Sequence, residues 1–237
     1  MAYYDFHIHS AFSEGKSSLE DIANRSKLLG YSGICFTMYY RNLQELEKLK
    51  VKVKNISKDF GVEIFLGFEA RNSHELNKLT KMRREYDLLL ARGSDLEFNR
   101  LAVETPEVDI LTHPELGRND SGLNHVMMKL AANNNVAIEI NFREISLSFK
   151  GSRSLILKNI SENVKLCKKY KTPLISCSGA ISHWQIKDPK VMMSFATLLG
   201  LKLDEAKRTI SDTPGNIIKM IKERKSKNWI MPGVKEI

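Results

Sequence analysis

Residues 108–114 of this 237-residue chain are Val-Asp-Ile-Leu-Thr-His-Pro, a short apolar run that ends in polar residues and a proline. A run of this kind is apolar on both faces, as a strand buried on both sides of a parallel sheet is. Six more such runs occur along the chain, at residues 3–8, 33–38, 62–68, 86–91, 136–141 and 173–178. Together with residues 108–112 they predict seven buried strands.

Stretches with helical periodicity separate these runs. Ser17 with Glu20 has the spacing of a capping box at the start of a predicted helix over residues 17–29. The same spacing recurs in Asn42 with Glu45 and in Asn72 with Glu75, whereas Asp188-Pro189 and Thr213-Pro214 each predict an N-cap followed by a proline at the first helical position. Residues 203–227 are predicted to be helical and residues 229–237 extended.

Seven strands that alternate with helices require parallel pairing and right-handed crossovers. A closed barrel is favoured over an open doubly wound sheet, because no glycine-rich phosphate-binding loop opens an early helix. No linker or low-complexity tract divides the chain, and its length suits one barrel. The sequence predicts an α/β fold: a TIM-like (β/α) barrel of about seven parallel strands, forming a single domain over residues 1–237 with a C-terminal helix and an extended tail.

The composition indicates a globular protein with an anionic partner. Hydrophobic residues make up 42% of the chain, which excludes disordered and fibrous classes. Lys and Arg number 37 against 28 Asp and Glu, a net charge of +9 that favours nucleic acid as partner, although a lysine-rich proteome is an alternative. The widely spaced Cys35, Cys167 and Cys177 predict reduced core thiols in a cytoplasmic protein. No apolar run approaches the roughly 18 residues that span a bilayer, so no membrane partner is expected.

Polar side chains collect at the predicted strand ends, where barrel proteins carry their chemistry. His7 and His9 lie two residues apart on the first strand, so both imidazoles point to the same side. Glu69 ends the third strand and His113 follows the fifth, so these four side chains could share a metal ion. An isolated His-x-His pair is more often part of a satisfied core, and spacing alone leaves both alternatives open.

Three of these segments resemble the polymerase-and-histidinol-phosphatase (PHP) superfamily: residues 5–10 (DFHIHS), Glu69, and Thr112-His113-Pro114. The resemblance implies a distorted (βα)7 barrel that holds two or three metal ions for phosphoester hydrolysis. The superfamily's last motif, Asp-x-His after the final strand, is replaced by Ser178-Gly179-Ala180, and His183 comes too late to match. Since a two-metal site needs enough anionic ligands, the replacement argues against hydrolysis by this chain.

Five further segments are similar to the archaeal ribonuclease P protein component 3 family: residues 99–104, 108–114, 133–140, 169–178 and 231–234. The resemblance runs from about residue 3 to residue 234. It implies a subunit of ribonuclease P, the ribonucleoprotein that removes the 5′ leader from precursor tRNA, with the cleavage performed by the RNA. The implied partners are the ribonuclease P RNA, precursor tRNA indirectly, and a small RRM-like subunit, component 2, in a heterotetramer. We expect no cofactor bound by the protein itself, and Mg²⁺ at the catalytic RNA.

Basic residues near the strand ends are the candidates for phosphate contact, because ordered phosphates are bound by positioned cations. We predict that the RNA-facing surface includes Arg92, Arg100, Arg143, Lys150 and Arg153. The alternative for each is a solvated or locally paired side chain. We expect no catalytic residue and no metal ligand.

Two other functions remain as alternatives to the ribonuclease P subunit. One is a metal-dependent PHP-type phosphoesterase that uses His7, His9, Glu69 and His113, with Asn141 as a further ligand. The other is a catalytically silent barrel that binds only proteins. The missing Asp-x-His argues against the first alternative, and the net charge argues against the second.

Overall fold

The computed structural model describes residues 1–226, 228–231 and 234–235. Its centre is one sheet of seven parallel strands in chain order: β1 (Tyr4–His9), β2 (Gly33–Met38), β3 (Glu63–Ala70), β4 (Leu88–Arg92), β5 (Ile110–Thr112), β6 (Ala137–Asn141) and β7 (Leu174–Cys177). A parallel bridge between Ile8 and Ala180 joins β1 to the chain just after β7. The sheet is therefore a nearly closed barrel, and the predicted fold class is confirmed.

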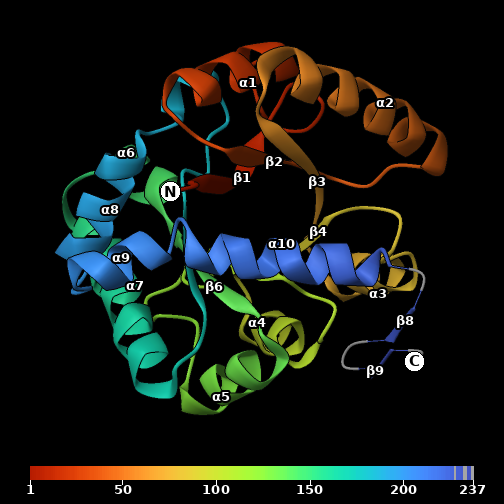
Figure 1. Cartoon of the computed structure of the whole chain (residues 1–237). Helices are drawn as coiled ribbons and strands as arrows, with labels where there is room; N and C mark the ends of the chain where they lie inside the picture. Colours follow the sequence, from red (N-terminus) through yellow and green to blue (C-terminus); the bar gives the residue numbers. More distant parts are fainter. Residues whose placement is uncertain (227, 232–233, 236–237) are drawn as a thin grey trace.

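Helices surround the barrel (Figure 1). Those between the strands are α1 (Leu19–Leu28), α2 (Leu43–Phe60), α3 (Ser73–Lys81), α4 (Leu96–Glu104), α5 (His125–Asn134), α6 (Phe142–Leu147) and α7 (Lys150–Tyr170). After β7 follow the 3₁₀ helix η1 (His183–Gln185), α8 (Pro189–Leu198), α9 (Leu203–Arg208), α10 (Asp212–Arg224) and an antiparallel pair of strands, β8 (Trp229–Met231) and β9 (Val234–Lys235).

The C-terminal predictions are confirmed with one change. The region predicted to be one helix is two, α9 and α10, and β8 and β9 fall within the segment predicted to be extended. Residue 227 of the predicted helix and residues 232–233 and 236–237 of the predicted tail lie outside the described residues.

Most predicted helix starts are confirmed by capping hydrogen bonds. The side chains of Asn42, Asn72 and Asp188 accept bonds from the backbone at the start of α2, α3 and α8. The prediction for Ser17 is wrong, because its neighbour Ser18 caps α1. The prediction for Thr213 is also wrong: α10 begins at Asp212, and Pro214 is tolerated because N–H groups in a first turn have no intrahelical partner.

One half of the barrel interior is apolar. Inward-facing side chains there include Phe6, Phe65, Leu88, Leu90, Ile110 and Ile175. Helix α10 runs across the barrel in Figure 1 and packs Ile217, Ile218 and Ile221 against this layer. This end of the barrel is therefore filled and sealed by the last helix.

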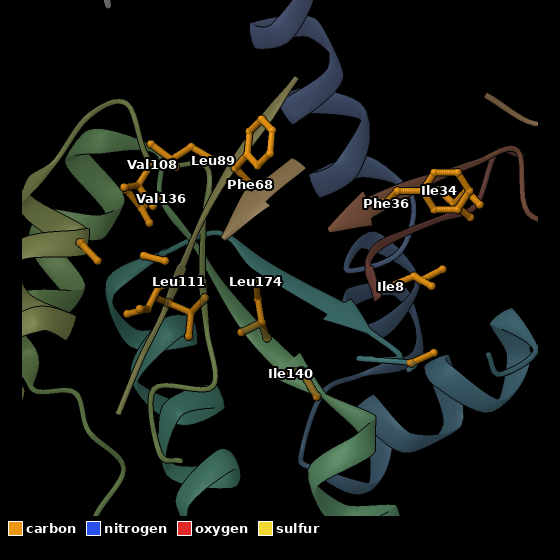
Figure 2. Close-up of a cluster of buried hydrophobic side chains, with 14 of the residues drawn as sticks. Ile8, Ile34, Phe36, Phe68, Leu89, Val108, Leu111, Val136, Ile140 and Leu174 are labelled. Atoms are coloured by element: carbon orange, nitrogen blue, oxygen red, sulfur yellow. The ribbon is translucent and has the colours of Figure 1, made fainter. Parts of the chain in front are cut away.

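The outward faces of the strands form a second core with the surrounding helices. Figure 2 shows part of it, with Ile34 and Phe36 from β2, Phe68 from β3 and Leu111 from β5. Alternation between the two cores explains why each strand is apolar on both faces. In the described part of the chain, no helix is both long and apolar enough to cross a membrane.

Candidate functional site

An irregularity in β1 sets the direction of the side chains at the other end of the barrel. The register of β1 against β2 shifts by one residue between Asp5 and Ile8. Phe6 belongs to the inner apolar layer and Ile8 to the outer core. Such β-bulges re-aim the side chains beside them. His7 and His9 both point into the barrel, where they meet polar residues of the other strands.

The two imidazoles lie at the centre of a buried cluster. His7 Nε2 is 3.1 Å from His9 Nε2, and His7 Nδ1 is 2.6 Å from Glu139 Oε1. The carboxylate of Glu69 lies 3.7 Å from His7 Nε2 and 3.8 Å from His9 Nε2. All four side chains are fully buried. The predicted grouping of His7, His9 and Glu69 is present in the structure.

His113 lies at the edge of this cluster. Its ring centre is 5.1 Å from that of His7, and its Nδ1 is 3.4 Å from Glu144 Oε1. The residue has a φ of 48°, and its backbone N–H donates to Glu139 Oε2 over 3.3 Å. Within the described residues neither ring nitrogen makes a hydrogen bond. His113 therefore joins the group, but on the side of Glu139 rather than of Glu69.

Burial and charge shift the pKa values of the two central histidines in opposite directions. Burial opposes a charged His7, but the adjacent Glu139 carboxylate overrides it, so the pKa of His7 is raised. Burial, and then the nearby His7, lower the pKa of His9 to about 2. Although burial acts against it, the His7 imidazole also helps to lower the pKa of Glu139 to about 2. The cluster thus contains a firmly ionised Glu139 and a neutral His9.

Glu14, in the loop between β1 and α1, brings a third carboxylate to this cluster. Glu14 Oε1 is 3.5 Å from His9 Nε2 and accepts a hydrogen bond from Arg143 Nη1 over 3.2 Å. Glu14 Oε2 accepts from Tyr39 Oη over 2.9 Å and from Arg92 Nη1 over 3.3 Å. The sequence did not reveal this arrangement, because no motif or periodicity marks a single loop glutamate.

The segment after β7 contributes no metal-binding side chain. Ser178 donates its backbone N–H to Asp5 Oδ1 over 3.1 Å. Gly179 has a φ of 61°, and a Cβ there would lie 2.5 Å from Asn141 Nδ2. Asn141, a possible ligand in the phosphoesterase alternative, instead donates to Glu139 and caps α6. The turn is therefore packed closely against the cluster.

The five residues predicted to face RNA fall in three places. Arg92 and Arg143 lie beside the cluster, where their side chains are 25% and 7% exposed and pair with Glu14. Arg100 is exposed on α4 and paired with Glu104 over 2.8 Å. Lys150 and Arg153 are exposed in the first turn of α7.

The donor atoms of the cluster suit a single metal ion better than two or three. Nitrogen and oxygen atoms of His7, His9 and Glu69 lie within 4.8 Å of one another, as do those of His7, His113 and Glu139. Oε2 of Glu69 is buried without a hydrogen-bond partner in the described residues. Since the two groups share His7 and the last PHP motif is absent, the cluster lacks the ligands of a hydrolytic multi-metal centre.

Sequence comparisons connect the chain to one protein family. It matches the family described as RNase P subunit p30 over residues 2–226. It is 36% identical to Ribonuclease P protein component 3 of Methanosarcina mazei over 236 residues, which cover 98% of this chain and 94% of that protein. The protein of the same name from Methanococcus maripaludis is 35% identical over 210 residues, 88% of this chain and 89% of that protein.

Structural comparisons agree. A chain in a cryo-EM structure of archaeal Ribonuclease P with mature tRNA matches with a TM-score of 0.81 at 29% identity, covering 97% of this chain and 96% of that chain. A β-aspartyl dipeptidase from Fervidobacterium islandicum matches with a TM-score of 0.60 at 12% identity, covering 92% of this chain and 72% of that chain. At such low identity the second match indicates a shared barrel fold alone.

Proposed function

The chain belongs to the RNase P subunit p30 family and is a protein subunit of ribonuclease P, and we propose that it supports the catalytic RNA without supplying catalytic residues of its own. The family match over residues 2–226 shows that the chain belongs to the family, and the absence of the Asp-x-His motif after β7 supports a role without catalytic residues. The net charge of +9 suits a protein that lies against RNA. The incomplete metal ligand set gives the phosphoesterase alternative no comparable support.

The start of α7 has the features of a phosphate contact. Phe149 precedes the helix without a side-chain capping bond, and the first turn contains no acidic residue. Backbone N–H groups at an uncapped helix start attract anions. Lys150 and Arg153 add two exposed cations there, and Phe149, 73% exposed, offers a ring for a base to stack on. This turn is therefore our first choice among the predicted RNA-facing positions.

Arg92 and Arg143 have a different role in this proposal. Arg143 is nearly buried and is paired with Glu14 and Glu144, so its guanidinium is committed within the protein. Arg92 is partly exposed and also pairs with Glu14. We propose that these two residues organise the polar end of the barrel. Arg100, Lys150 and Arg153 are exposed, and we propose that they contact RNA, although Arg100 also pairs with Glu104 and Arg153 also donates to the Ser148 carbonyl.

The proposal extends to the partner and the compartment. The family resemblance supports pairing with a small RRM-like subunit, component 2, in a heterotetramer that binds the ribonuclease P RNA and contacts precursor tRNA indirectly. In this arrangement Mg²⁺ is bound by the RNA, where cleavage occurs. All three cysteines are free and buried, as suits the reducing cytoplasm.

Charge reversal at α7 tests the RNA contact. We expect Lys150→Glu with Arg153→Glu to weaken binding to ribonuclease P RNA and to reduce the slope of log affinity against log salt by about 2, because each lost phosphate contact removes about one released counterion. Binding is measured by filter retention at several salt concentrations, and precursor tRNA cleavage is measured in the reconstituted enzyme.

Two exposed lysines on α2 supply the matched control. Lys48→Glu with Lys54→Glu changes the net charge equally, and α2 lies across the barrel from α7 (Figure 1). The control should lose less affinity and keep its salt slope. Equal losses of RNA affinity in the two double variants would show that net charge, and not the α7 turn, determines binding.

A further inference from the structure

We propose that a cavity beside α7 takes up one unpaired RNA base that carries an exocyclic amino group, and that Glu115 accepts a hydrogen bond from that group. The cavity has a volume of about 240 Å³ and lies between the loop after β5, the helix α6 and the first two turns of α7. This inference rests on the proposed function, and it names the part of the RNA that the α7 surface selects.

Glu115 is the residue of this cavity that calls for a ligand. It lines the cavity and is only 3% exposed, and within the described residues neither of its carboxylate oxygens has a hydrogen-bond partner. Because a buried polar group without a partner is costly, these two oxygens favour a ligand that donates hydrogen bonds. A carboxyl group keeps an acceptor oxygen whether or not it carries a proton, so the preference holds in either protonation state.

The rest of the lining suits a flat ring. Leu116 from the loop, and Leu155 and Ile156 from α7, supply apolar surface against which the faces of a ring can pack. Apolar walls with a few convergent polar groups are the usual composition of a small-ligand site. Sites for drug-sized ligands measure about 300 to 1,000 Å³. The smaller volume of this cavity therefore suits a single ring system rather than a whole nucleotide.

Hydrogen bonds hold the loop that forms one wall of the cavity. Asn99 Nδ2 donates to the carbonyl groups of Pro114 and Gly122 over 2.9 and 3.0 Å, so both ends of the loop are fixed to α4. On the other side, Asn159 Nδ2 of α7 donates to the Arg118 carbonyl over 3.5 Å. The cavity is therefore formed before a ligand enters, which lowers the entropic cost of binding.

The surroundings of the cavity favour RNA as the source of the ring. Ser152, an exposed residue of the lining, lies between Lys150 and Arg153 in the first turn of α7. A strand whose phosphates contact these two cations would bring an adjoining base to the cavity. Proteins that read RNA sequence mostly bind unpaired bases through their free edges. Adenine, guanine and cytosine carry an amino group on that edge and uracil does not, so the cavity should exclude uracil.

Chemical probing of ribonuclease P RNA bound to the full-length protein tests the cavity. Dimethyl sulfate attacks the Watson–Crick edges of adenine and cytosine, and kethoxal attacks that of guanine. We expect the parent protein to protect at least one unpaired base, and Glu115→Leu to lose this protection and to bind the RNA about tenfold more weakly. Glu115→Gln keeps an acceptor oxygen and should keep the protection. The same pattern of protection with the parent and with Glu115→Leu would overturn the proposal.

A second variant and a matched control separate the cavity from the phosphate contacts. Ser152→Trp blocks the cavity but leaves Lys150 and Arg153 in place, so it should lose protection of the same base. Glu162→Leu, at an exposed position on α7, should protect it as the parent does. Circular dichroism confirms that each variant folds. Failure of the parent to bind the RNA at all would contradict the proposed function itself, whereas a parent that binds the RNA without protecting any base from either reagent would overturn only the cavity proposal.

Discussion

The protonation state of a carboxylate in this protein depends on whether the side chain is buried, and Glu115 is an example. Glu115 follows β5 and is fully buried, and neither carboxylate oxygen has a hydrogen-bond partner within the described residues. Burial is the main cause that raises its pKa to about 8, well above the ordinary value of 4.5. The folded chain therefore holds a proton at neutral pH that the unfolded chain has released.

This difference predicts how stability changes with pH. Between pH 4.5 and about 8 the folded state binds one more proton than the unfolded state at Glu115, so the free energy of unfolding falls as pH rises. The contribution is on the order of 1.4 kcal/mol per pH unit. Glu115→Gln should remove this pH dependence. The free energy of unfolding of the variant, compared with that of the parent, should therefore be higher at pH 8 than at pH 5. Urea unfolding at the two pH values measures the effect, and parallel pH profiles for variant and parent would contradict it.

Individual residues of the candidate site were predictable only where a strand fixes the direction in which the side chain points. His7 and His9 share a side because they are two residues apart on β1, and Glu69 lies next to the end of β3, two strands away in the sheet. Glu14 and Tyr39 lie in the loops after β1 and β2, whose paths depend on contacts that no local pattern records. Glu139 lies in the middle of β6, and its pairing with His7 depends on closure of the barrel.

At the scale of elements, the strands were predictable because each is buried on both faces and stands out as an apolar run. The starts of α2 and α3 were predictable because a single asparagine precedes each helix. The start of α1 was not, because Ser17 and Ser18 are both competent caps. Ser17 instead bonds to His183, a contact between distant parts of the chain, and this leaves Ser18 to cap α1.

The cap assignment at α1 can be measured. Ser18→Ala should cost about 1 kcal/mol of stability, the usual value of an N-cap, and should loosen amide protection in the first turn of α1. Ser17→Ala should leave this protection intact, because Ser17 bonds to His183 rather than to the helix. Loss of first-turn protection in the Ser17 variant and not in the Ser18 variant would reverse the assignment.

At the scale of the whole molecule, the alternation of strands and helices predicted the order of the strands in the barrel. It did not predict that α10 closes the apolar end of the barrel. Helix α10 was predictable as a helix, whereas its packing against the inner apolar layer depends on the assembled barrel. Beside it, Asp109 accepts hydrogen bonds from both Arg83 and Arg224, which ties α10 to the loops at this end. The C-terminal helix is thus a part of the core.

Truncation of an α10 side chain that packs against the inner apolar layer should therefore lower the free energy of unfolding as much as truncation of any other core side chain. Ile217 is 2% exposed, and Ile217→Ala should destabilise the protein by about 2 to 5 kcal/mol. Leu198→Ala, at a position on α8 that is 76% exposed, serves as the control and should change stability by less than about 0.5 kcal/mol. Equal midpoints for these two variants in denaturant would mean that α10 does not seal the barrel.

The position of α10 also constrains how the protein is made. The strands emerge from the ribosome in the order in which they pair, so each new one can dock on its predecessor. The inner apolar layer nevertheless stays open to water until residues 212–224 have been synthesised. We infer that folding during translation halts at an unsealed barrel, and that this nascent intermediate is the form most exposed to chaperones and to aggregation.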